Sequence, residues 1–230
     1  MKTLTLALCL LTTTITHDWK KDRSVEGFSG LRVSSGINVY LTQGNSEKLT
    51  LDVKGLEEED VKAEVKNGTL NLYIERRGVM NWVNNRNTSV KAYVTFRALK
   101  SIQASGGADV TGQGHLTFQD LDVQAGGGAD VALDLTASRL NVSASGGADA
   151  KLTGRADLIN AASSGGSDLD ARNLTAKSGT ASSSGGSDVY IRASDELSLK
   201  ASGGSDIYYY GSARVLTKQK SGGSDISHRD

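Results

Sequence analysis

The chain has 230 residues, with 26 Lys and Arg against 26 Asp and Glu, 27 Gly, no Pro and one Cys. Zero net charge gives no whole-chain field for nucleic acid or an anionic membrane, so neither is expected as a partner. An apolar share of 37% is too high for a disordered chain, whereas an aromatic share of 5% is too low for a bulky globular core. Any core is therefore thin and built from aliphatic and small side chains.

The first sixteen residues have the pattern of a secretory signal. Lys2 precedes an apolar run from Leu4 to Ile15, and a charged segment follows it. The run is too short to span a bilayer. We predict a signal peptide over 1–16, a linker over 17–23, and export to the periplasm, the cell envelope or the medium. A buried N-terminal strand or helix is the alternative. Cys9 would leave with the signal, and we expect no transmembrane segment in the mature chain.

A four-residue phrase, Gly-Gly-Ala/Ser-Asp, recurs seven times at separations of 21, 19, 19, 20, 18 and 19 residues. Its aspartates are Asp109, Asp130, Asp149, Asp168, Asp188, Asp206 and Asp225. Apolar and polar residues alternate between the phrases, which indicates two short strands per repeat. A unit this short cannot bury its apolar face alone, so copies must stack, with equivalent strands paired in parallel about 4.8 Å apart. The sequence therefore predicts an all-β protein, with a parallel β-solenoid over 101–230.

The phrase itself suits a corner of each coil. Glycine accepts the positive φ of a sharp turn, and a small neighbour lets successive coils approach closely. The aspartate has two interpretations. Its carboxylate caps backbone N–H groups of the turn, or carboxylates stacked in a column hold Ca²⁺ between coils. We favour the turn cap, because calcium-binding nonapeptide solenoids have two ligating turns per coil and this chain has one. No other cofactor is expected.

Residues 24–100 differ from the repeats and predict a head of longer strands. Asn67-Gly68 between two alternating segments is a hairpin signal. The segment 34–39, Ser-Ser-Gly-Ile-Asn-Val, looks like a degenerate copy of the corner phrase. The head is therefore expected to begin the same coil as an atypical terminal unit.

Several of these phrases resemble a known bacterial family. They are the Phe-Ser-Gly-Leu-Arg-Val run at 28–33, the Ser-Gly-Ile-Asn-Val run at 35–39, the Val-Lys-Asn-Gly-Thr-Leu run at 65–70 and the Gly-Gly-x-Asp repeats. They are similar to the head GIN domain, also called putative auto-transporter adhesin, over nearly all of the mature chain. The resemblance implies a secreted or cell-envelope β-solenoid with a role in adhesion, and it carries over no catalytic residue. The chain departs from the family at Phe96-Arg97-Ala98, where a proline is common, and in having no lipobox.

No catalytic residue is predicted. His17, His115 and His228 have no metal-ligand spacing, and the chain contains no nucleophile elbow, phosphate loop or His-Glu-x-x-His motif. We predict a non-catalytic protein that binds a surface component. A calcium-stabilised scaffold and a polysaccharide-acting β-helix enzyme are the alternatives.

Two exposed aromatic groups are candidate ligand or partner surfaces. They are Trp82, in a polar loop of the head, and Tyr208-Tyr209-Tyr210, where alternation places Tyr209 on the opposite face from its neighbours. A cell-surface glycan or protein would suit either. Core packing of the tyrosines and anchoring of the loop by Trp82 are the alternatives. Little sequence follows the seventh phrase, so either the charged tail covers the last coil or a second copy does, giving an end-on homo-oligomer.

Overall fold

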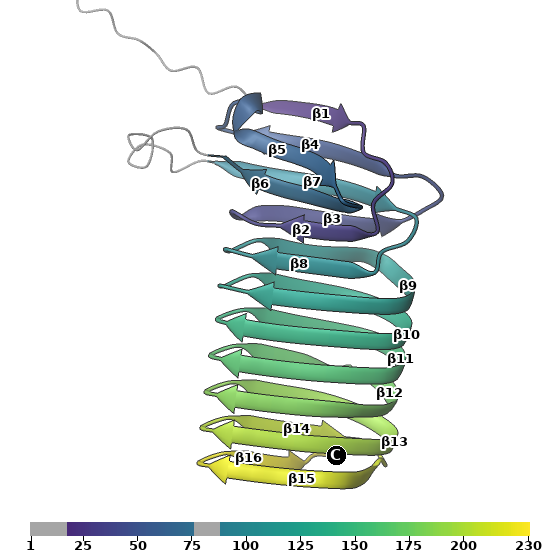
Figure 1. Ribbon diagram of the computed structural model, residues 1–230, viewed down its shortest axis with the longest axis vertical. Coiled ribbons are helices and arrows are strands. Elements are labelled where there is room, and N and C mark those ends of the chain that lie inside the picture. The colour runs from purple at the N-terminus through teal and green to yellow at the C-terminus, as the bar shows by residue number, and fades with distance from the viewer. Residues whose placement is uncertain (1–17, 76–87) are drawn as a thin grey trace, which may run out of the picture.

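The computed structural model describes residues 18–75 and 88–230, which form a single stack of β-coils (Figure 1). The head contains β1 (Trp19–Arg23), β2 (Gly30–Val33), β3 (Ile37–Gln43), β4 (Lys48–Lys54), the 3-10 turn η1 (Glu58–Asp60), β5 (Val61–Lys66), β6 (Thr69–Ile74) and β7 (Ser89–Phe96). The coils contain β8 (Ser101–Ser105), β9 (Asp109–Gly126), β10 (Asp130–Gly146), β11 (Asp149–Gly165), β12 (Asp168–Gly185), β13 (Asp188–Gly203), β14 (Asp206–Tyr210), β15 (Arg214–Gly222) and β16 (Asp225–His228). The predicted all-β parallel solenoid is confirmed. No helix in these two ranges has the length and apolarity to cross a membrane.

The regular coils are built from long strands rather than pairs of short ones. Each of β9 to β13 runs around most of a coil in 16 to 18 residues and pairs in parallel with the next. We call the part that follows each Gly-Gly corner the first face, which also includes β3, β14 and β16. The second face comprises the later halves of β9 to β13 together with β2, β8 and β15, and the two faces meet at a smooth bend (Figure 1).

The core consists of columns of inward-facing aliphatic residues, one per coil. The column beside the corner contains Val110, Val131, Ala150, Leu169, Val189, Ile207 and Ile226, all at most 2% exposed. Alanine and serine fill the inward columns that lie still closer to the corner, where the two faces converge. The core is therefore thin and made of aliphatic and small side chains, as the composition predicts. Burial of their apolar surface stabilises the stack of coils.

The corners require glycine at their first position. Gly165, Gly185 and Gly203 have φ of +83°, +84° and +79°. A Cβ on Gly185 would lie 3.0 Å from the carbonyl oxygen of Gly165 in the preceding coil. A side chain is therefore excluded both by backbone conformation and by the close approach of coils.

A serine hydroxyl closes the turn in the later corners. Ser187 Oγ accepts from the N–H of Ser184 at 3.3 Å and donates to its carbonyl oxygen at 3.0 Å. The same pair of bonds links Ser167 to Ser164. In the four corners that contain it, the serine of the phrase therefore caps the turn, a role that was expected of the aspartate.

The head continues the same stack, as the degenerate corner phrase suggested. In the register of β3 with β9, Asn38 lies beside Asp109, and β2 pairs with β8 in the same direction. Antiparallel strands then extend the stack: β4 pairs with β7, β1 with β4, and β5 with β6 through the hairpin at Asn67-Gly68. The segment expected as a linker, 17–23, contains β1, where Trp19 Nε1 donates to the carbonyl oxygen of Leu56 at 2.9 Å.

Charged residues cover the last coil. In the register of β13 with β15, Lys218 takes the inward column of Leu199, and Lys220 takes that of Ala201. Lys218 Nζ lies 5.8 Å from the centre of the Tyr209 ring, which in turn packs on His228. These lysines belong to β15 rather than to the tail, and the end-on homo-oligomer stays an untested prediction.

Candidate binding surfaces

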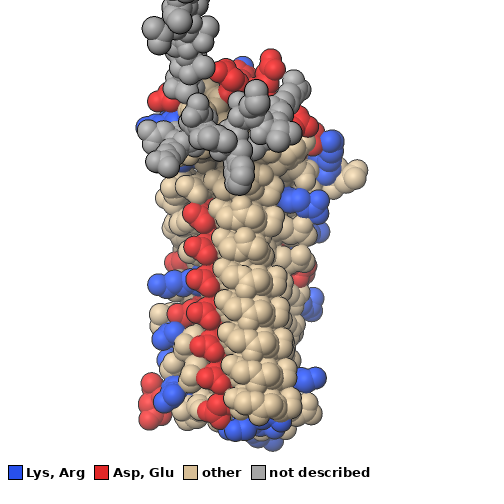
Figure 2. All heavy atoms as spheres, turned by 90° about the vertical axis from the view of Figure 1, so that its left-hand side faces the viewer, with Lys and Arg blue, Asp and Glu red and all other residues tan. Residues whose placement is uncertain are grey.

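The seven aspartates of the phrase form one row along the first face, beside a broad uncharged stripe of corner residues (Figure 2). Two of these carboxylates accept a hydrogen bond from a backbone N–H group of the next coil. Asp149 Oδ1 accepts from Asp168 at 3.3 Å, and Asp206 Oδ1 accepts from Asp225 at 3.0 Å. Asp149 and Asp206 therefore each link two coils.

Burial, together with repulsion between neighbouring carboxylates, raises the pKa of two aspartates of the row. Burial, and after it the charge of Asp130, raises the pKa of Asp109. Burial, and after it the charges of Asp168 and Asp206, raises the pKa of Asp188. The row contains no group of three or more His, Cys, Asp or Glu that could hold a metal ion, and neither does any other part of the described chain. A Ca²⁺ column therefore stays an untested prediction.

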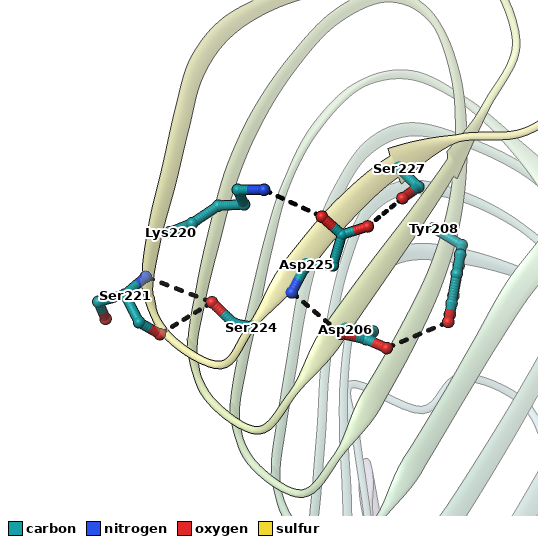
Figure 3. A network of polar contacts seen from close by, with 7 residues as sticks. All are labelled: Asp206, Tyr208, Lys220, Ser221, Ser224, Asp225 and Ser227. Carbon is teal, nitrogen blue, oxygen red and sulfur yellow. Dashed lines mark hydrogen bonds and ion pairs between the residues drawn. The ribbon is translucent and has the colours of Figure 1, made fainter.

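The last aspartate of the row is the exception. Hydrogen bonds from Ser227 and from Lys220, whose Nζ lies 2.9 Å from Asp225 Oδ1, lower the pKa of Asp225 to about 2 (Figure 3). On the neighbouring coil, the Tyr208 hydroxyl donates to Asp206 Oδ2 at 3.2 Å. The C-terminal corner is thus a closed polar network that ties the terminal strand β16 to the coils before it.

An arginine–tyrosine face lies next to this network, on the outer side of β12, β13, β14 and the C-terminal tail. We define it by Arg172, Tyr190, Arg192, Tyr208, Tyr210 and Arg229. The rings of Tyr190 and Tyr208 stack at 4.9 Å between centres. The Arg172 guanidinium carbon lies 4.0 Å from the centre of the Tyr190 ring, and that of Arg229 lies 5.1 Å from the Tyr208 ring. A guanidinium therefore covers each end of the ring stack.

The three consecutive tyrosines divide as alternation predicted. Tyr208 and Tyr210 lie on the arginine–tyrosine face, where Tyr210 has Arg192 5.3 Å from its ring centre. Tyr209 packs against the core and against His228. The other aromatic candidate, Trp82, lies outside the described residues.

The histidines form no recognisable catalytic site where the structure describes them. His115 is about half exposed, with Nδ1 3.2 Å from Asp134 Oδ1 and Nε2 2.8 Å from Thr136 Oγ1. These three residues lie on the outer side of the first face. None of them lines the shallow groove that the second face carries over β9 to β12. His228 packs on Tyr209 at the end of the stack, and His17 is outside the described residues.

Sequence reasoning missed Arg172, Tyr190, Arg192 and Arg229. The available signal was the repeat itself, because Tyr190 and Tyr208 each stand two residues after the aspartate of their own phrase. Residues at the same offset from the phrase stack on one another, so Tyr190 could have been placed beside Tyr208 by counting.

These features define the class of protein: an all-β parallel solenoid that begins with a head of partly antiparallel strands. The chain belongs to the family described as "Putative auto-transporter adhesin, head GIN domain", whose model matches residues 27–213. No curated protein matches it.

Solved structures share the fold over nearly the whole chain. A putative adhesin from Bacteroides fragilis is 27% identical, with a TM-score of 0.82, and the match covers 93% of this chain and 97% of that one. A putative lipid binding protein from Parabacteroides distasonis is 15% identical, with a TM-score of 0.69 over 93% and 97% of the two chains. A putative adhesin from Parabacteroides merdae is 16% identical, with a TM-score of 0.66 over 93% and 96%.

Proposed function

We propose that this protein is a non-catalytic, adhesin-like protein of the bacterial cell envelope that binds a surface component through its arginine–tyrosine face. The observation that carries the proposal is the stacking of Arg172, Tyr190, Tyr208 and Arg229 on one outward surface. Tyrosine and arginine are enriched at the energetic centres of protein interfaces, because they bury a large area at low entropic cost and offer polar tips.

Of the three guanidiniums on this face, those of Arg192 and Arg229 are available to a partner. The third, that of Arg172, forms an ion pair with Asp170 at 2.8 Å. Arg192 donates through Nε to the carbonyl oxygen of Arg172, and Arg229 lies over a ring, yet neither forms an ion pair with a described acidic residue. A planar guanidinium group that is already held by stacking on a ring loses little side-chain entropy when it forms hydrogen bonds. The face is therefore preorganised for a partner that presents hydrogen-bond acceptors.

Export supports the same role. The signal-like segment 1–16 lies outside the described residues, so secretion rests on its sequence pattern and on the adhesin family. We propose that the mature protein works in the periplasm, at the envelope or outside the cell.

An enzymatic role has less support. Glycoside hydrolases need two carboxylic acids placed on either side of the bond that they cleave. The groove of the second face is lined by a single acidic residue, Asp122, and by no Lys, Arg or His. The polar residues that it does contain are suited to binding rather than to proton transfer.

The test is adsorption of the fluorescently labelled protein to isolated bacterial cell envelopes. We expect saturable adsorption that falls about tenfold in affinity for the double variant Arg192→Gln/Arg229→Gln, the size of a lost hot-spot contact. The matched control is Lys151→Gln/Arg155→Gln, which removes the same charge from exposed positions of β11 on the same face. Non-saturable adsorption, or an equal loss in the control, would overturn the proposal.

A further inference from the structure

The second face carries a shallow groove over β9 to β12, away from the arginine–tyrosine face. Its volume is about 350 Å³, and the outward side chains that line it are those of Ser, Thr, Asn, Gln and Ala with one carboxylate. The lining is almost uncharged although charged residues make up 23% of the chain. A ligand in this groove would therefore meet hydrogen-bonding groups rather than a strong field.

The groove exists because small residues replace long ones in one outward column. Ser143, Ala162 and Ser182 occupy this column on successive coils, between Gln124 before them and Lys200 after them. Three coils at a strand spacing of about 4.8 Å give a depression roughly 14 Å long, parallel to the axis of the stack. Its length and direction suit a narrow, extended ligand.

One wall of the groove is a ladder of hydrogen-bonded side chains. Asn141 Nδ2 donates to Asp122 Oδ1 at 2.5 Å, and Asn160 Nδ2 donates to Asn141 Oδ1 at 2.8 Å. Thr180 Oγ1 then donates to Asn160 Oδ1 at 2.9 Å. All three bonds run in the same direction, so the side chains are fixed in one orientation.

The ladder leaves polar groups available. A side-chain amide has two N–H donors and an oxygen with two lone pairs. The ladder uses one donor and one lone pair of Asn141 and of Asn160. Each amide thus keeps one donor and one acceptor at the groove, and the two amides repeat at the coil spacing.

We propose that this groove binds an uncharged, unbranched polysaccharide segment that lies along the solenoid axis. Two adjacent hydroxyls of a sugar ring can accept from one amide N–H and donate to one amide oxygen, which is the pair that each asparagine offers. In an extended β-1,4-linked chain, one sugar unit advances by about one coil spacing. Neighbouring units are turned over relative to each other, so they present different hydroxyls to the two asparagines. Preorganised amides lower the entropic cost of binding.

The surface fits other polymers less well. An extended peptide binds by adding a strand to an open sheet edge. The groove instead lies on a sheet face, where β10 and β11 already pair through their backbones. An acidic polysaccharide or a nucleic acid needs basic side chains, and the lining contains none.

Titration calorimetry of the full chain with chitohexaose and with cellohexaose tests the proposal. We expect at least one of the two to bind at submillimolar concentration. The variant Ala162→Gln should abolish binding by filling the groove, and it should fold, because Gln124 occupies the same column. Asn160→Ala should weaken binding about tenfold. Thr175→Gln, an exposed position on the first face, is the matched control and should bind as the parent does.

Three results would overturn the proposal. They are no binding of either hexasaccharide at millimolar concentration, equal losses for Ala162→Gln and Thr175→Gln, and tighter binding of an oligogalacturonate than of the neutral chains. This site is separate from the arginine–tyrosine face, so the two proposals fail separately. The variant Arg192→Gln/Arg229→Gln should leave hexasaccharide binding unchanged, and Ala162→Gln should leave the effect of the arginines on envelope adsorption unchanged.

Discussion

Lys220 lies in the inward column that Ala201 occupies one coil earlier, and its ammonium group reaches Asp225 Oδ1 at 2.9 Å. A lysine that points inward on the last strand of a sheet places a charge where another coil would bury an apolar residue. Natural β-sheets use such inward charges to prevent edge-to-edge association. The C-terminal end of the stack is built in this way.

We therefore expect the protein to be monomeric through this end and the double variant Lys218→Leu/Lys220→Ala to self-associate. The substitutions restore the apolar columns of β13 and leave an open strand edge beside them. Light scattering at micromolar concentrations would measure the change. Lys200→Ala, an outward-facing lysine one coil earlier, is the control and should stay monomeric. A parent protein that dimerises through β15 would contradict this prediction and support the end-on homo-oligomer.

Removing one charge from the aspartate row should stabilise the fold. The pKa of Asp188 is raised, so its contribution to stability is present below the ordinary value of 3.8 and is lost as pH rises through the folded-state pKa. Asp188→Asn should therefore raise the free energy of unfolding at pH 7 by about 0.5 kcal/mol, the size of a cross-strand like-charge pair. Urea unfolding at pH 7 and pH 3.5 measures this, and the gain should be smaller at the lower pH.

The opposite sign is expected for Asp225→Asn. The pKa of Asp225 is lowered to about 2 by Ser227 and Lys220, so its contribution is present above 3.8 and is lost as pH falls toward 2. The variant should be less stable than the parent at pH 7, and the difference should shrink as the pH falls below 3.8. If both variants shifted stability in the same direction at pH 7, the interpretation of the row as repelling carboxylates with a paired end would be wrong.

The two glycines of a corner should respond differently to alanine. Gly185→Ala places a Cβ at φ of +84° and 3.0 Å from the carbonyl oxygen of Gly165, so it should cost about 2 kcal/mol or more. Gly186→Ala meets the same oxygen at 3.6 Å, an ordinary contact, and should change stability by less than about 0.5 kcal/mol. Chemical denaturation would compare the two, and equal losses would contradict the corner geometry.

Adding calcium tests directly whether the aspartate row binds Ca²⁺ between coils. Carboxylates that bond to the N–H of the next coil, as Asp149 and Asp206 do, are already satisfied in part. We therefore expect the same thermal midpoint, by circular dichroism, in EDTA and in millimolar Ca²⁺. A clear rise with Ca²⁺ would show that the row binds metal and would favour the calcium-stabilised scaffold.

The spacing of the Gly-Gly-Ala/Ser-Asp phrase was sufficient to predict the solenoid. Coils of nearly constant length must stack, and glycine at a positive φ fixes where each one turns, so Asp149 could be placed between Asp130 and Asp168 by counting alone. The alternation after Asp206 likewise separated Tyr209 from Tyr208. These properties depend on local backbone geometry and on a period of two, both of which can be read from the chain.

Only the tertiary structure decided which side chains meet on the faces away from the corner. Coils of unequal length absorb their extra residues within the strands, so the register shifts between Lys151 and Thr153 and again between Ala171 and Thr175. Beyond such a shift, counting from the phrase no longer gives the neighbour. The pairing of Thr175 with Arg192, and through it the place of Arg192 on the arginine–tyrosine face, follows from where the chain bulges, which depends on how adjacent coils pack together.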